Sequence, residues 1–547
     1  MEKKTVVIQT KLGQLRGLVC KSILTEKDFY SFRGIPYGKP PLGELRFKAA
    51  QPFGSWEGVR DALDNGPDPK QPPMGPIEVP GMDLTTNDED CLYINVYMNE
   101  LPTKDSVKKP VLFSIHGGAF LVGSGGSKMN GAEHLLYDDV VVVAFNYRCG
   151  AFGFLSLENE EVPGNAGLKD QTLALKWVHD NIESFGGDPN NVTIFGISAG
   201  GYSVGFHLVS PSSRGLFHKA IMQSGSPMNS LLIQDNPRSQ ATKLAKTLGC
   251  TSDDPDTVLQ FLQSVPADDI VAATKTMSKE KEAVKKVTLI FTPSVEVSGN
   301  EPFLTDDPDK LMKTGQFAHV PVIIGCCAHE SSVIAMFDGV CDETFNTFNE
   351  NPEWLVSPCL ELKPGSANAK EAQKAIWDFY LKGKPISWDN LTGYMNYQSD
   401  NLFVLGMHLT RKELLKKSKE PVYTYLFSNH SRCICQFFAH FLPAYASILD
   451  PSRTCHGADS LFTYGSSEGL PLSPVDKEAI KKHVKAWTTF ASTGNPNADE
   501  LGATWKNDSI AEPCYMDIAS PWALKEGVIF SDRMCFWEKL LSKYSNS

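Results

Sequence analysis

The sequence has 547 residues, 41% of them hydrophobic, and a formal net charge of -12. A chain of this length and composition can bury a large core, so we expect a globular protein. The negative charge and the lack of basic runs argue against nucleic-acid binding, which needs clustered Lys and Arg, and the longest apolar runs fall well short of the roughly 18 to 20 residues of a membrane span.

The ends of the chain and its cysteines predict a cytoplasmic protein. The N-terminus carries no apolar signal segment and the C-terminus no hydrophobic tail or targeting motif, provided that no leader preceded residue 1. The 13 cysteines are odd in number and dispersed, which favours thiols over a disulfide framework or a metal cluster. The N-x-S/T sequons are interpreted as chance matches; they start at Asn191, Asn390, Asn429 and Asn507.

In chain order, short β-rich runs alternate with helical patterns. Between the runs at residues 140–147 and 192–195, a helical pattern at residues 169–182 places Leu175, Val178 and Ile182 on one apolar face. Alternating strands and helices predict βα units around a buried parallel sheet. The runs cover residues 110–115, 140–147, 192–195, 320–325 and 422–427.

The pattern G-x-S-x-G occurs twice, and its context differs between the two matches. Around Ser198 it follows the predicted strand at 192–195 and precedes a helical pattern, which is the setting of a nucleophile elbow. There the serine occupies a strained turn, and glycines such as Gly196 and Gly200 let strand and helix backbones approach. The second match, around Ser467, follows no buried strand and is assigned to a polar loop. Ser198 is therefore the candidate nucleophile.

A nucleophilic serine needs three further groups. A histidine takes its proton, an acid orients that histidine, and N–H groups stabilise the oxyanion that forms on the substrate. The segment IHGGAF, residues 115–120, follows a predicted strand, and its backbone can face a substrate oxygen. Taken alone it is a glycine turn after a strand. Together with the later elbow and a downstream histidine, it gives the motif order of an α/β-hydrolase.

Longer segments accompany these motifs. With HGGAF and GISAG they resemble the type-B carboxylesterase and cholinesterase family over most of the chain, and within it the cytosolic insect-type carboxylesterases. The resemblance implies an α/β fold of the α/β-hydrolase type, with a central, mostly parallel twisted sheet flanked by helices, helical insertions that form a gorge, and a single domain over residues 1–547. It implies no cofactor or metal. The segments are FRGIPYGKPPLGELRF, EDCLYINVY, FNYRCGAFGFL and QSGSP.

The resemblance also implies the roles of individual residues. By matching position, Ser198 is the nucleophile, Glu330 in VIIGCCAHESS is the acid, and His456 in CHGADSLF is the base. The matching oxyanion donors are the backbone amides of Gly118, Ala119 and Ala199. Ser224 in QSGSP matches a family serine near the acid and the histidine, although a helix cap or a turn hydroxyl explains it equally well.

The other histidines have plainer explanations. His116 belongs to the strand end that precedes the oxyanion glycines, and His179 and His483 lie in amphipathic helical patterns. His329 is adjacent to the acid on the same loop, so it is poorly placed to be oriented by it. His440 is expected to be packed in the interior rather than to bind a ligand.

The sequence also departs from its relatives. Cholinesterases carry a tryptophan shortly before the EDC segment, but VPGMDLTTNDEDC contains no aromatic residue, so choline selectivity is not expected. Secreted members pair the EDC cysteine with one at the position of Pro69, which leaves Cys91 single; the position of a second bridge, to Cys250, is held by Phe261. Losing both bridges fits a reducing compartment. Ile197 stands where many relatives carry an acidic residue or glutamine.

We therefore expect a carboxylesterase of broad specificity that acts through an acyl-enzyme on Ser198. Its substrates would be small-molecule esters, its role xenobiotic or insecticide detoxification, and organophosphates would be covalent inhibitors that it also scavenges. Two alternatives stay open. One is a lipid or hormone esterase with a narrow substrate, although juvenile-hormone esterases typically carry glutamine where Ile197 stands. The other is a non-catalytic family member that acts by binding.

Overall fold

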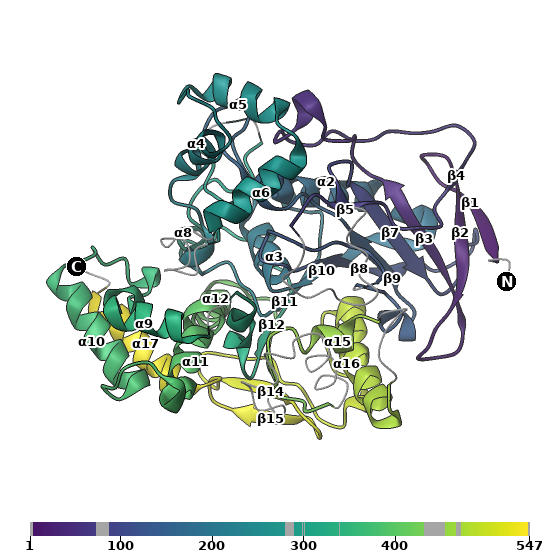
Figure 1. The fold of residues 1–547 in the computed structure, drawn as a ribbon. Coiled ribbons are helices and arrows are strands. Elements are labelled where there is room, and N and C mark those ends of the chain that lie inside the picture. Colours follow the sequence, from purple (N-terminus) through teal and green to yellow (C-terminus); the bar gives the residue numbers. More distant parts are fainter. Residues whose placement is uncertain are drawn as a thin grey trace.

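The computed structural model describes residues 4–72, 87–128, 130–278, 289–297, 299, 301–337, 340–431, 454–465 and 472–544. Within them, one 13-stranded sheet forms the centre of the molecule (Figure 1). Its strand order is β1-β2-β3-β7-β9-β8-β10-β11-β12-β13-β14-β15, and β4 pairs with β2. A separate two-stranded ladder joins β5 and β6.

The strands span short segments. They are β1 (Thr5–Gln9), β2 (Gln14–Lys21), β3 (Asp28–Pro36), β4 (Val59–Asp61), β5 (Asp68–Pro69), β6 (Asn87–Asp88), β7 (Tyr93–Met98), β8 (Lys109–Ile115), β9 (Val141–Phe145), β10 (Gly187–Ile197), β11 (Lys219–Gln223), β12 (Val322–Cys327), β13 (Val422–Phe427), β14 (Cys514–Ile518) and β15 (Ala523–Glu526).

The middle of the sheet is parallel, as predicted. Every neighbouring pair from β9 through β8 and β10 to β14 is parallel. The pairs from β9 through β7, β3 and β2 to β1 are antiparallel, as is the pair of β14 and β15, while β4 joins β2 in parallel. The five predicted β-rich runs form β8, β9, β10, β12 and β13. Strand β12 begins at Val322 rather than at residue 320, since Pro321 has no N–H to donate to a ladder.

Helices cover both faces of the sheet. The predicted helix at 169–182 is present as α2, and the elbow helix α3 ends at Val209, before Pro211. The α-helices are α1 (Gly150–Phe154), α2 (Ala166–Asn181), α3 (Ala199–Val209), α4 (Pro237–Thr247), α5 (Pro255–Ser264), α6 (Ala267–Ser278), α8 (Pro308–Lys313), α9 (Asp342–Glu350), α10 (Ala367–Leu381), α11 (Leu391–Ser399), α12 (Leu405–Lys417), α15 (Ser460–Thr463), α16 (Pro474–Thr493) and α17 (Ser531–Tyr544).

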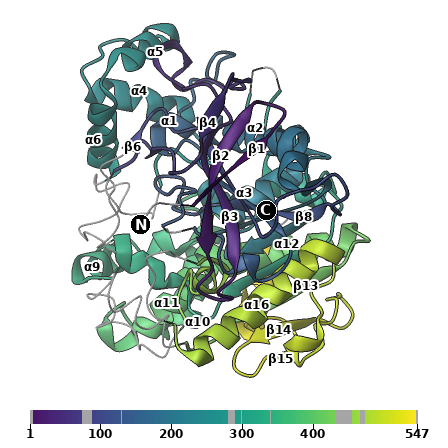
Figure 2. The same ribbon diagram turned by 90° about the vertical axis from the view of Figure 1, so that its right-hand side faces the viewer.

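Alternate side chains of the central strands feed two separate cores. In β8, Val111 and Phe113 pack in the cluster that contains residues of α2, α3 and α12, while Leu112 packs in the cluster that contains Trp487 of α16. This is the period-two pattern of a strand that is buried on both sides, which explains why the predicted runs are continuously apolar. Figure 2 shows α16 on the side of the sheet opposite to α4, α5 and α6.

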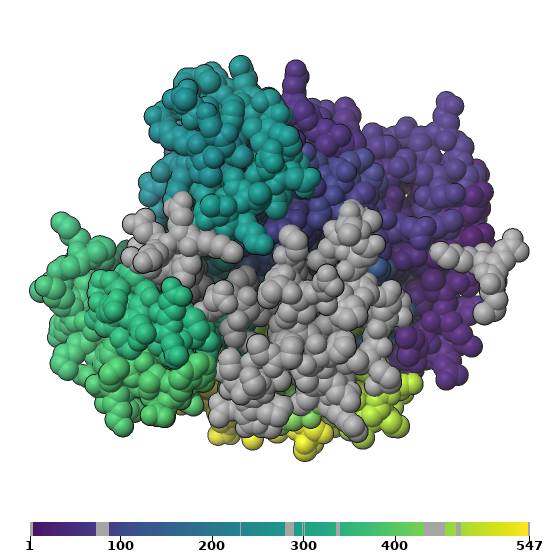
Figure 3. Space-filling view, in the orientation of Figure 1, coloured from purple at the N-terminus to yellow at the C-terminus, as the bar shows by residue number. Residues whose placement is uncertain are grey.

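Two groups of the helices between β11 and β13 stand out from this layered body. In the space-filling view, α4–α6 in teal and α9–α10 in green form two bulges on the same face of the molecule (Figure 3). The predicted helical insertions are therefore present. The gorge expected between them and the predicted single domain over residues 1–547 stay predictions.

A buried histidine makes the stability of this fold depend on pH. His207 of α3 is fully buried, with Nδ1 2.7 Å from Ser213 Oγ and Nε2 3.0 Å from Gln171 Oε1. Burial lowers the pKa of His207 to about 3, whereas an unfolded histidine has a pKa of about 6.5. Between these values the unfolded chain binds the extra proton, so the stability that neutral His207 contributes is complete above about pH 6.5 and is lost as pH falls.

We expect His207→Gln to flatten the acid side of the stability profile. Glutamine keeps polar contacts but binds no proton, so the free energy of unfolding should fall less steeply between pH 6 and pH 4, by about 1.4 kcal/mol per pH unit. Urea unfolding across this pH range measures the slope. His179→Gln, at a half-exposed histidine of α2, is the control for replacing a helical histidine by glutamine. Equal slopes for His207→Gln and the parent would contradict the assignment.

Candidate active site

Ser198 lies at the turn between β10 and α3, where the sequence places the elbow. Its backbone has φ 56° and ψ -125°, a left-handed conformation that is strained for a residue with a side chain. The Ser198 N–H donates to the Gln223 carbonyl at the end of β11 over 2.9 Å, and the Ser198 carbonyl accepts from the Tyr202 N–H over 2.9 Å. These bonds fix the turn from both sides.

The glycines of the elbow are required for space rather than for backbone conformation. A Cβ on Gly200 would lie 2.0 Å from the Ile115 carbonyl oxygen, and a Cβ on Gly196 would lie 2.6 Å from the Gly200 carbonyl carbon. A Cβ on Gly201 would lie 2.7 Å from the Gln223 carbonyl oxygen. Helix α3 therefore starts in direct backbone contact with the ends of β8 and β11.

The predicted acid and base, Glu330 and His456, are hydrogen-bonded to each other. Glu330 begins the 3-10 helix η7 (Glu330–Phe337) after β12 and is fully buried. Its Oε2 lies 2.5 Å from Nδ1 of His456, and its Oε1 accepts from the Ser224 hydroxyl and from the Cys327 N–H, both over 2.6 Å. The carboxylate thus holds the proton of His456 on Nδ1, which leaves Nε2 as the basic nitrogen.

The segments that carry Ser198 and His456 adjoin one another. A Cβ on Gly457, next to the histidine, would lie 3.8 Å from Cδ1 of Ile197, next to the serine. The ring of Phe403 packs against the imidazole of His456, with 4.5 Å between ring centroids. Phe403 also contacts the Tyr202 ring of α3, at 6.3 Å between centroids. The His456 segment therefore adjoins the elbow, and the His456 ring packs against Phe403.

The predicted oxyanion loop also adjoins Ser198. A Cβ on Gly117 would be 3.2 Å from Cβ of Ser198. The backbone turns sharply there, with φ 119° at Gly118 and 57° at Ala119. Among the residues that the structure describes, the N–H groups of Gly118, Ala119 and Ala199 donate to no protein acceptor. They are available to a substrate oxygen.

His116 supports this loop, in the position expected for it. Its ring stacks on Tyr147 with 4.1 Å between centroids, the Tyr147 hydroxyl donates to the His116 carbonyl over 2.9 Å, and His116 Nδ1 lies 2.8 Å from the Gly117 carbonyl oxygen. Burial lowers the pKa of His116 to about 4, so the ring is neutral near pH 7. The loop is thus held by an uncharged stacked pair.

The remaining histidines and the second serine match are placed as follows. His483 is buried in α16 and stacks on Trp487 at 3.9 Å between centroids, and His179 lies half-exposed on α2. The His329 N–H donates to the Thr454 carbonyl over 2.9 Å. The predictions for His440 and for Ser467 lie outside the described residues.

Several residues of this site were not singled out by the sequence. Ser332 bonds to the backbone of His456 over 2.9 Å. Asp459 is fully buried and accepts from Tyr425 Oη over 2.7 Å and from Gln223 Nε2 over 3.0 Å, and burial raises its pKa. The signal for Asp459 was its place in the H-G-x-D pattern; Ser332 and Phe403 have no local signal.

Phe403 is presented by a π-helical turn. The turn η11 (Asp400–Val404) connects α11 and α12, and π turns are frequent at functional sites. The Leu402 carbonyl accepts from the Tyr202 hydroxyl and from Asn229 Nδ2, the latter over 2.6 Å. Tyr202 ties the widened turn to α3, the helix that follows Ser198, and Asn229 ties it to the segment after β11.

The structure describes the two cysteines for which the sequence predicts no bridging partner. Cys91 and Cys250 are buried free thiols, Pro69 lies in β5, and Phe261 lies in α5. The compartment stays a prediction. In the part of the chain that the structure describes, no group of three or more His, Cys, Asp and Glu residues is placed to hold a metal ion. The helices of those residues include none long and apolar enough to cross a membrane.

A serine elbow on a central parallel strand, followed along the chain by an acid and then a histidine, is the arrangement of the α/β-hydrolases. The carboxylesterase family matches residues 4–537, and the chain belongs to this family. It is 34% identical to the juvenile hormone esterase of Tribolium castaneum, over 94% of this chain and 87% of that protein. It is 32% identical to the carboxylic ester hydrolase of Bombus ignitus, over 97% of this chain and 94% of that protein.

The fold is likewise shared with a solved structure. The juvenile hormone esterase of Manduca sexta, with OTFP covalently attached, superposes with a TM-score of 0.87 and 29% identity, over 98% of this chain and 100% of that chain. The predicted family, the α/β-hydrolase fold and the enzyme class, a carboxylic-ester hydrolase, are confirmed.

We expect Gly200→Ala to disable the elbow. Its Cβ would meet the Ile115 carbonyl oxygen at 2.0 Å, so the helix start must move away from β8 and carry Ser198 with it. The expected destabilisation is at least about 3 kcal/mol, at the upper end for overpacking. Thermal unfolding and ester turnover measure the effect. Gly126→Ala is the control, because its Cβ would meet side-chain atoms alone, the nearest of them Ser124 Oγ at 3.1 Å. Equal behaviour of the two variants would contradict the packing argument.

Proposed function

We propose that this protein hydrolyses small neutral carboxylic esters through an acyl-enzyme on Ser198. The observation that carries the proposal is the buried Glu330 carboxylate, bonded to His456 beside a serine elbow. Glu330 fixes the imidazole tautomer, His456 is the general base, and the amides of Gly118, Ala119 and Ala199 are the oxyanion donors.

The chemistry follows the order of these groups. Ser198 Oγ attacks the ester carbonyl while Nε2 of His456 takes its proton, and the three amides stabilise the tetrahedral oxyanion by about 3 kcal/mol for each well-placed donor. His456 then protonates the leaving alcohol as the C–O bond breaks. A water repeats the sequence on the acyl-enzyme, so that acid and alcohol leave and the serine is restored.

The surroundings of the site favour apolar, uncharged substrates. Ile197, Tyr202 and Phe403 are the nearly buried side chains that adjoin Ser198 and His456. An isoleucine at position 197 puts no negative charge beside the nucleophile. Broad-specificity detoxification of xenobiotic esters is therefore our first proposal for the role of the enzyme.

A narrower role as a hormone esterase is the second candidate. It is favoured by the similarity to the juvenile hormone esterases of Tribolium castaneum and Manduca sexta. The two roles separate by kcat/KM. A broad esterase should hydrolyse p-nitrophenyl acetate, butyrate and hexanoate and a juvenile hormone methyl ester with comparable values, whereas a kcat/KM for the hormone that exceeds the others by orders of magnitude would establish the narrow role.

The first test is hydrolysis of p-nitrophenyl butyrate with Ser198→Ala as the paired variant. Removing the nucleophile should lower kcat by a factor of about a thousand or more, without changing the thermal midpoint. Ser467→Ala, in the second G-x-S-x-G match, is the control and should keep parental turnover. Full activity in Ser198→Ala, or an inert parent protein, would overturn the proposed mechanism and favour a binding role.

Organophosphates provide an independent test of the nucleophile. Diethyl p-nitrophenyl phosphate should react once per active site: a bond forms between Ser198 Oγ and phosphorus, the P–O bond to p-nitrophenolate breaks, and His456 takes the serine proton. A burst of one p-nitrophenol per chain is expected, with one diethylphosphoryl group on the peptide that contains Ser198. No burst, or a label on another residue, would contradict the assignment. Slow return of ester turnover after the burst would mark a scavenger.

A further inference from the structure

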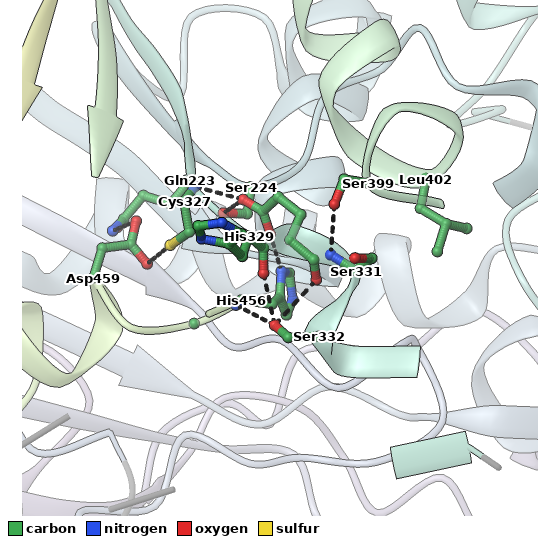
Figure 4. A network of polar contacts seen from close by, with 12 residues as sticks. Gln223, Ser224, Cys327, His329, Ser331, Ser332, Ser399, Leu402, His456 and Asp459 are labelled. Carbon is green, nitrogen blue, oxygen red and sulfur yellow. Dashed lines mark hydrogen bonds and ion pairs between the residues drawn. The ribbon is translucent and has the colours of Figure 1, made fainter. Parts of the chain in front are cut away.

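The loop that carries His456 is joined to the loop that carries Glu330 by a second contact besides the carboxylate–imidazole pair. The Ser332 hydroxyl accepts a hydrogen bond from the His456 N–H over 2.9 Å and donates one to the His329 carbonyl over 2.7 Å (Figure 4). Ser332 is fully buried. A hydroxyl has a single proton, and here it points to His329, so a lone pair is left for His456.

This hydroxyl continues a short backbone ladder. The Ala328 N–H donates to the Phe427 carbonyl over 3.0 Å, the His329 N–H donates to the Thr454 carbonyl over 2.9 Å, and His329 and Cys455 form a parallel bridge. One residue further, the chain turns into η7 at Glu330. Beyond this point the acceptor for the His456 N–H is the Ser332 side chain instead of a backbone carbonyl.

We propose that Ser332 is a positioning residue for His456, an inference that rests on the proposed function. Glu330 fixes one end of the imidazole, but a ring held at one nitrogen can still pivot about that contact. Ser332 fixes the backbone from which the ring extends, and Phe403 packs on its face. With the backbone and Nδ1 both held, the position of Nε2 relative to Ser198 is set.

The size of the effect follows from the geometry of proton transfer. A displacement of about 1 Å in a reacting group costs about 100-fold in rate. Loss of the Ser332 hydroxyl leaves the His456 N–H without its partner and frees the loop to shift. His456 transfers protons in both acylation and deacylation, so both steps should slow together. We therefore expect a change in kcat rather than in KM.

Ser331 offers a matched control in the same buried turn. It is almost fully buried, and it makes a hydrogen bond through its backbone: the Ser331 N–H donates to Ser399 Oγ over 3.0 Å. Alanine at position 331 keeps that bond. The pair Ser332→Ala and Ser331→Ala thus removes a buried serine hydroxyl from adjacent positions, and only one of the two hydroxyls contacts His456.

The experiment measures p-nitrophenyl butyrate turnover per active site. Active sites are counted by the p-nitrophenol burst from diethyl p-nitrophenyl phosphate. Because kcat is then calculated per reactive site, unfolded protein does not lower its value. Ser332→Ala should lower kcat about 10- to 100-fold with KM within about twofold of the parent, whereas Ser331→Ala should keep parental values. Ser332→Thr, which keeps the hydroxyl, should recover most of the loss. If Ser332→Ala yields no folded protein, Ser332→Cys takes its place, with a smaller loss of kcat in the same direction.

The outcomes separate the inference from the proposed function. If Ser332→Ala matches Ser331→Ala in turnover per site, or loses only thermal stability and titratable sites, the positioning role is overturned. A loss of kcat in Ser332→Thr equal to that in Ser332→Ala would overturn it too. If Ser198→Ala is as active as the parent, the proposed function itself fails. An active parent, an inactive Ser198→Ala and an unchanged Ser332→Ala would remove this inference alone.

Discussion

The burial of one carboxylate constrains the whole site. Glu330 has no exposure to solvent, and a buried charge is tolerated only when hydrogen bonds and an opposite charge replace its water. Its partners come from three places in the chain: Ser224 after β11, the Cys327 N–H at the end of β12, and His456 between β13 and α16. Each partner must be within hydrogen-bonding distance at once, so the carboxylate ties these segments together.

The parallel sheet makes that convergence possible. Gly196 of β10 pairs with Ile115 of β8, Ile197 pairs with Gln223 of β11, and Gln223 pairs with Gly325 of β12. The carboxyl ends of these strands therefore stop at nearly the same level of the sheet. The segments that follow these strands directly are the predicted oxyanion loop, the elbow at Ser198, Ser224 and the loop of Glu330. Because the strands are buried and end together, these segments lie at the same edge of the sheet.

The strand runs and the elbow could be predicted because each depends on a local pattern, whereas Glu330 and His456 were assigned by matching their positions to the family that the sequence resembles. Buried parallel strands are continuously apolar, and an elbow needs small residues at fixed spacing. Ser332 and Phe403 could not be found in this way. Ser332 lies 124 residues from His456, from whose N–H it accepts a hydrogen bond. Tyr202 lies 200 residues from Leu402, to whose carbonyl it donates one. Contacts between such distant segments depend on tertiary packing, which leaves no period or spacing in the sequence.

The π-helical turn at Asp400–Val404 has a consequence for how this active site can diverge. A π turn closes its hydrogen bond over one residue more than an α turn does, so the helix from α11 to α12 contains a residue in excess of regular geometry. Removing or adding a residue at such a point rotates the side chains of the turn around the helix axis while the helices on either side stay intact. The position of Phe403 against His456 is therefore open to change by length as well as by substitution, without disturbing the sheet that leads to Ser198.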